Sequence, residues 1–122
     1  MKTLVSGIVA VLLLSTGLIA SEDTSLARLL QQEQNLAQKV EMAYLQGKPY
    51  QDHLAKLKKI QRQVRAKADH GEAGTMTEFL DFCIVNLENT VKQPRNKDNT
   101  QIVSDLDKSI YEGCQYLSKL DR

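Results

Sequence analysis

The chain has 122 residues, with 16 Lys and Arg against 15 Asp and Glu, and a formal net charge of +1 at pH 7. This near-neutral balance argues against a dedicated nucleic-acid-binding protein, which normally carries a strong basic excess. With no tryptophan, two phenylalanines and four tyrosines, its core must consist mainly of Leu, Ile, Val and Ala. A chain of this length buries one modest core, so we expect a single domain.

The first 20 residues have the composition of a secretory signal peptide. Lys2 precedes a run that is apolar from Leu4 to Ala20, and the polar sequence SEDTS follows it. The run is about 17 residues long, at the short limit for a helix that spans a bilayer. We therefore expect cleavage after Ala20 and a periplasmic or secreted domain over 21–122. An uncleaved anchor is the alternative, in which the leader alone meets the membrane.

Apolar residues recur at three- and four-residue steps in four segments, which is typical of amphipathic helices. No segment shows the alternation expected of a strand. The sequence therefore predicts an all-α fold, a small antiparallel four-helix bundle that follows the N-terminal signal segment. The expected helices cover about 24–46, 50–69, 75–92 and 99–120.

Turn residues mark the ends of these helices. The glycine and proline of GKP at 47–49 end the first helix and begin the second. Thr75 and Glu78 have the spacing of a capping box at the start of the third helix, and Pro94 ends it. Either residue of the pair Asp98 and Asn99 is suited to cap the fourth helix.

The third predicted helix is the most apolar, and we expect it to be the most buried. Its apolar residues extend beyond one face at Phe82, Ile84 and Val85. Burial within the monomer is favoured over a client-binding groove or a homodimer interface. The second predicted helix is strongly basic outside its apolar face, which favours a solvated surface over a site for phosphate or an acidic partner. Its basic residues are Lys56, Lys58, Lys59, Arg62, Arg65 and Lys67.

The two cysteines, Cys83 and Cys114, each lie on an apolar helical face. In an exported chain they most simply form one intramolecular disulfide. In a square hairpin, however, their heights differ by roughly 9 Å, whereas disulfide-bonded Cα atoms lie within about 7 Å. An offset or tilt must supply the difference, and two free thiols or an intermolecular bridge are the alternatives.

No catalytic, metal or cofactor motif is present. His53 and His70 have no motif spacing to a cysteine, which disfavours a nucleophilic thiol or a zinc site. Met42 and Met76 suit core positions better than haem ligation, since no C-x-x-C-H motif occurs. We therefore expect no enzyme activity, no metal and no cofactor.

A small exported bundle without catalytic residues most often acts through its surface. The leading hypothesis is an immunity or inhibitor protein that blocks a toxin or a cell-wall hydrolase in the periplasm. The linker KQPRNKDN between the last two helices is the expected partner-binding segment, because Pro94 stiffens it and loops often carry function. Its candidate contact residues are Lys92, Gln93, Arg95 and Asn96, against the alternative of a plain connector.

Two other functions remain open. The first alternative is a periplasmic chaperone or secretion-system adaptor, which would expose an apolar groove for a client. The second is a bundle that carries haem or another ligand.

Overall fold

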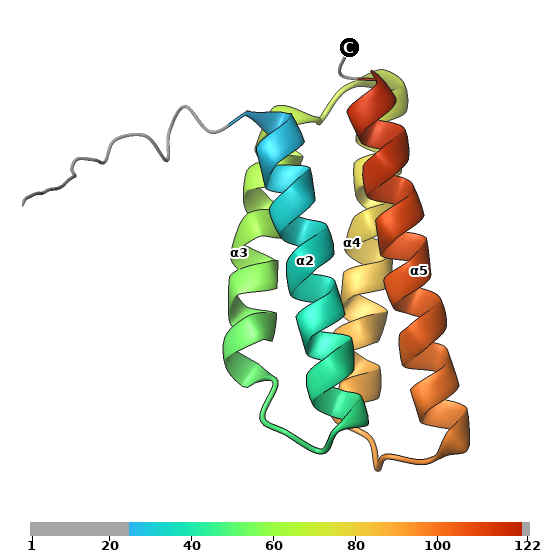
Figure 1. The fold of residues 1–122 in the computed structure, drawn as a ribbon. Helices are drawn as coiled ribbons and strands as arrows, with labels where there is room; N and C mark the ends of the chain where they lie inside the picture. The colour runs from blue at the N-terminus through green and yellow to red at the C-terminus, as the bar shows by residue number, and fades with distance from the viewer. Residues whose placement is uncertain (1–24, 121–122) are drawn as a thin grey trace, which may run out of the picture.

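The computed structural model describes residues 25–120, which form four α-helices and no strand. The helices are α2 (Leu26–Leu45), α3 (Gln51–Lys67), α4 (Gly71–Val91) and α5 (Lys97–Leu120). They lie side by side as an antiparallel bundle (Figure 1), which confirms the predicted fold class. The signal peptide predicted for 1–20 lies outside the described residues. None of the helices in the described part is long and apolar enough to cross a bilayer.

The helices close into a ring in which each one packs against two neighbours. Helix α2 contacts α3 and α5, and α4 contacts the same two helices from the other side. The least extensive of the four interfaces is the one between α3 and α4. The turns 46–50 and 92–96 lie together at one end of the bundle (Figure 1).

One continuous cluster of aliphatic side chains fills the space between the helices. The predicted apolar faces of α2 and α3 supply much of it, including Val40, Leu57 and Val64. Both Cys83 and Cys114 belong to this core. Among residues 25–120, Tyr44 is the one aromatic residue in the buried cluster, so the core depends on branched side chains that fit closely.

Helix α4 is more exposed than its composition suggests. Phe79, Phe82 and Val85 expose 43%, 65% and 50% of their surface, whereas Ile84 is buried. The expectation that this helix is the most buried is therefore wrong. Like every helix of the ring, α4 has two neighbours and an outer face, and its apolar residues beyond the core-facing side are exposed.

Two helix starts also differ from the prediction. Helix α4 begins at Gly71, so Thr75 lies within its first turns and donates to the Gly71 carbonyl at 3.3 Å instead of forming a capping box. Helix α5 begins at Lys97. Its cap is the Asn96 side-chain oxygen, which accepts from the Asn99 backbone N–H at 2.8 Å.

Gly113 allows α4 and α5 to approach each other closely. A Cβ atom at this position would lie 2.7 Å from Leu80 Cδ2 and 3.4 Å from the Met76 sulfur. The absent side chain therefore fixes the register of the two helices, with Gly113 opposite Leu80.

This register explains why the structure lacks the predicted disulfide, since both cysteines are buried free thiols. In antiparallel helices, residues after Leu80 lie opposite residues before Gly113. Cys83 and Cys114 are thus offset by about 6 Å along the axis. The Cys114 thiol turns towards α2 instead, where it donates to Glu33 Oε1 at 3.5 Å.

We expect Gly113→Val to lower the free energy of unfolding by about 2 kcal/mol, because the added methyl groups must displace Leu80. Valine has the better helix propensity, so a loss would come from packing. Glu112→Val, at the exposed neighbouring position, is the control and should change stability by less than about 0.5 kcal/mol. Urea unfolding measures both, and equal effects would contradict the close approach.

Candidate protein-binding end of the bundle

The two turns at one end of the bundle are tied together by Tyr44. This buried side chain lies in the last turn of α2, and its hydroxyl is 3.1 Å from the Gln93 carbonyl and 2.9 Å from the Pro94 carbonyl. The hydroxyl donates to this pair of oxygens, which belong to the linker between α4 and α5. One side chain therefore fixes the position of the linker against α2.

The turn that follows α2 has the geometry of a Schellman motif. Gly47 has a φ of 69°, a left-handed conformation that favours glycine. The Gly47 N–H donates to the Tyr44 carbonyl at 3.1 Å, and the Lys48 N–H donates to the Ala43 carbonyl at 2.8 Å. These bonds satisfy the last carbonyls of α2 and direct the chain towards Pro49.

The side chain of Arg95 lies over this turn. A Cβ atom at Gly47 would lie 3.2 Å from Arg95 Cζ, so the guanidinium occupies space that only glycine leaves open. Arg95 nonetheless remains exposed and forms no ion pair or hydrogen bond within residues 25–120. Its donors therefore remain available to a partner.

The remaining predicted contact residues differ in their availability. The side chain of Gln93 is exposed and makes no side-chain hydrogen bond in the described part of the chain. The Asn96 oxygen caps α5, so it serves the fold. Lys92 Nζ lies 3.7 Å from Glu88 Oε2. Of the four residues proposed from the sequence, the structure thus leaves Gln93 and Arg95 the freest.

Exposed cations surround these two residues. Both turns contribute, and the exposed acids nearest to them in the sequence are Asp52 and Asp98. The cations at this end are Lys48, Lys92, Arg95 and Lys97. This end of the bundle is therefore a basic surface on a rigid frame, which we call the basic end.

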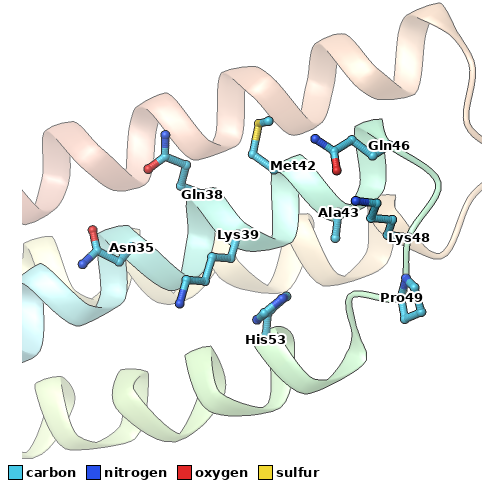
Figure 2. A pocket seen from close by; sticks show the side chains of 9 residues that line it. All are labelled: Asn35, Gln38, Lys39, Met42, Ala43, Gln46, Lys48, Pro49 and His53. Carbon is cyan, nitrogen blue, oxygen red and sulfur yellow. The ribbon is translucent and has the colours of Figure 1, made fainter.

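A groove between α2 and α3 opens next to the basic end. It has a volume of about 530 Å³, and its lining includes Lys39, Met42, Lys48 and His53. Figure 2 shows Lys39 on α2 and His53 on α3 beside the space between the two helices. The groove therefore combines apolar surface with positive charge.

A polar group lies in the middle of the core, where the sequence analysis placed none. Glu33 is 0% exposed, and burial raises its pKa from 4.5 to about 7, with a contribution from the negative charge of Asp81. Its Oε2 atom has no partner among the described residues. Glu33 is four residues from both Leu29 and Ala37, and this spacing was the signal that it shares their buried face.

Polar contacts join α3 to α4 beside the apolar core. Gln61 Nε2 donates to Asp81 Oδ1 at 2.7 Å, and Arg65 Nε donates to Asp81 Oδ2 at 2.8 Å. Lys58 and Glu88 form a second ion pair at 3.0 Å. The least extensive interface of the ring therefore carries two ion pairs.

Two acids, Glu41 of α2 and Asp107 of α5, lie close together. Burial raises the pKa of Asp107, as do its hydrogen bond with Glu41 and the repulsion between the two carboxyl groups. Ser104 donates to Glu41 Oε2 at 2.6 Å. Asp107 therefore retains its proton at a higher pH than an isolated carboxyl group.

The geometry gives little support to the two other candidate sites, a nucleophilic thiol and a metal site. Burial raises the pKa of the Cys83 and Cys114 thiols, so neither is poised as a nucleophile. Within residues 25–120, no three side chains of His, Cys, Asp or Glu gather into a possible metal site. His70 hydrogen-bonds to the adjacent Asp69, and His53 lies in the groove.

No protein-family model, curated protein or solved structure matches this chain.

We expect Tyr44→Phe to release the linker, because it removes the hydroxyl bound to the Gln93 and Pro94 carbonyls. The expected loss of stability is about 1 kcal/mol, with faster amide hydrogen exchange at 92–96. Tyr111→Phe removes an exposed hydroxyl and should change neither quantity. Unchanged exchange at 92–96 in Tyr44→Phe would contradict the tie.

We expect the protein to lose stability as the pH rises from 4 to 8. The Glu33 pKa is higher in the folded state than its ordinary 4.5, so its contribution is intact below pH 4.5 and is lost as the pH rises through about 7. This shift corresponds to about 3 kcal/mol. Glu33→Gln should therefore stabilise the protein at pH 8 and have little effect at pH 4. Glu78→Gln, at an exposed site, is the control, and unfolding curves at both pH values are the measurement.

Proposed function

We propose that this chain is a protein-binding protein that blocks a toxin or a cell-wall hydrolase, as an immunity protein does, and that it docks through the basic end. The observation that carries this proposal is the exposed guanidinium of Arg95 beside Gly47, which forms no ion pair or hydrogen bond within residues 25–120. A guanidinium with free donors is suited to bidentate binding of a carboxylate, and arginine is enriched among the residues that dominate interface energies. We expect the partner to offer an acidic cleft.

The rigidity of the linker supports the same proposal. Its carbonyls are held by Tyr44, and Asn99 Nδ2 donates to the Pro94 carbonyl at 2.7 Å. A segment that is ordered before binding loses less conformational entropy on association. The linker is thus suited to enter a cleft without rearrangement.

Export remains part of the proposal and rests on the composition of the first 20 residues. Since the fold contains no disulfide, it does not itself require an oxidising compartment. The leader is therefore the sole argument for a periplasmic or secreted location.

The test is capture of the native partner with the purified chain, followed by an assay of the captured activity. We expect one stoichiometric hydrolase or toxin that the chain inhibits, and at least a tenfold weaker complex for Arg95→Glu, because a buried pair loses one partner and gains repulsion. Arg62→Glu, at an exposed position on α3, is matched in charge and should bind normally. Equal loss in both variants would refute docking through the basic end. A captured protein without such activity would refute the inhibitory function.

The alternative is a chaperone or adaptor, which the exposed apolar residues of α4 favour. Phe79, Phe82 and Val85 form an unpaired surface of the kind that binds clients or a second copy of the chain. In the same capture experiment, a mixture of unfolded proteins that is lost on Phe82→Ser would support this function. The solution mass then distinguishes a client surface from a homodimer.

A further inference from the structure

The groove beside the basic end continues along most of α2. A second hollow of about 470 Å³ adjoins the first, and both are lined by Asn35 and Lys39. Together they extend between α2 and α3 from Leu29 to Gln46. At 1.5 Å per residue this is a length of about 26 Å.

The charge of this groove has one sign. Four lysines line it, none of them in an ion pair within residues 25–120, and no acid belongs to its lining. The four are Lys39, Lys48, Lys56 and Lys59. The opposite side of α3 differs, because there Lys58 and Arg65 are paired with acids of α4. The basic residues of α3 thus divide into a paired side and an unpaired side.

Apolar side chains line the same groove between the lysines. Leu36 and Ile60 are half-buried, Pro49 lies at one end, and Met42 exposes 44% of its surface. Methionine adapts its shape to varied partners, which suits a binding surface. The groove therefore presents an apolar floor with cations at its margins.

We propose that this groove binds an acidic amphipathic helix of a partner protein, about 17 residues long. The walls are helices whose backbone groups are already paired, so an extended peptide would find no backbone partners there. A helix satisfies its own backbone hydrogen bonds and can place apolar residues at i, i+3, i+4 and i+7 on the floor. Its acidic face would then meet the four lysines.

The shape of the surface favours a helix over a membrane. Interfacial membrane binding uses a protruding apolar face, whereas these apolar residues lie in a hollow between two helices. The inference deepens the proposed function, because Lys48 and Pro49 join the groove to the basic end. A partner whose cleft receives Arg95 would thus extend an acidic helix along α2 and α3.

The experiment uses a fluorescein-labelled 18-residue peptide with leucines at helical spacing and glutamates elsewhere, titrated with the purified chain. We expect saturable binding with a gain of helical circular dichroism, and at least tenfold weaker binding to Lys39→Glu/Lys59→Glu. The matched control is Lys108→Glu/Lys119→Glu, which changes the same charge at exposed sites on α5. A peptide of the same composition in scrambled order should bind at least tenfold more weakly.

Several outcomes would overturn the inference. These are equal binding of the scrambled peptide, equal loss in both double variants, or binding to anionic phosphatidylglycerol vesicles without binding to the peptide. Arg95→Glu should weaken peptide binding less than Lys39→Glu/Lys59→Glu does, because Arg95 lies beside Gly47 and outside the groove lining. Loss of partner capture in Arg95→Glu, together with no peptide binding to the unaltered chain, would refute the groove while it supports the proposed function. Peptide binding to the unaltered chain, with no effect of Arg95→Glu on partner capture, would support the groove and refute docking through the basic end.

Discussion

The geometry of the basic end depends on the Tyr44 hydroxyl. Helical bundles usually leave their connections free to vary, yet here a side chain from the core of α2 reaches the carbonyls of the opposite linker. The same helix end requires Gly47, and Gly47 in turn leaves room for Arg95. Two connections that are far apart in the sequence are thereby held as one surface. Rigidity of this kind is what a binding loop needs and what a simple connector does not.

The rest of the molecule divides into well-packed and polar interfaces. Helices α4 and α5 meet at Gly113 with close apolar contact, whereas the smaller interface between α3 and α4 carries the ion pairs of Asp81 and Glu88. Helix α3 therefore packs more extensively against α2 than against α4. Since the core is not crosslinked, the match of its aliphatic side chains stabilises the ring, and Glu33 is accommodated at the cost of a retained proton.

Much of this architecture follows from helical periodicity, because apolar spacing and the GKP turn define local structure directly. The buried faces of α2 and α3 were predicted for that reason. Features that depend on how the helices pack against one another could not be predicted from periodicity. The exposure of Phe82, the register that separates Cys83 from Cys114, and the use of Asn96 as a cap all require knowledge of the neighbouring helix or turn.

At the candidate site, the sequence indicated the linker because of its polarity and Pro94, but it gave no sign of Tyr44 as its anchor. An aromatic residue at the end of an apolar face predicts burial and says nothing about where its hydroxyl is directed. Periodicity likewise treats each helix alone, so it does not reveal a groove between two of them. The two buried carboxyl sites also affect the charge of the whole molecule. Because Glu33 and Asp107 hold protons near neutrality, the chain takes up hydrogen ions from solvent as it folds, and the folded protein is more basic than its composition implies.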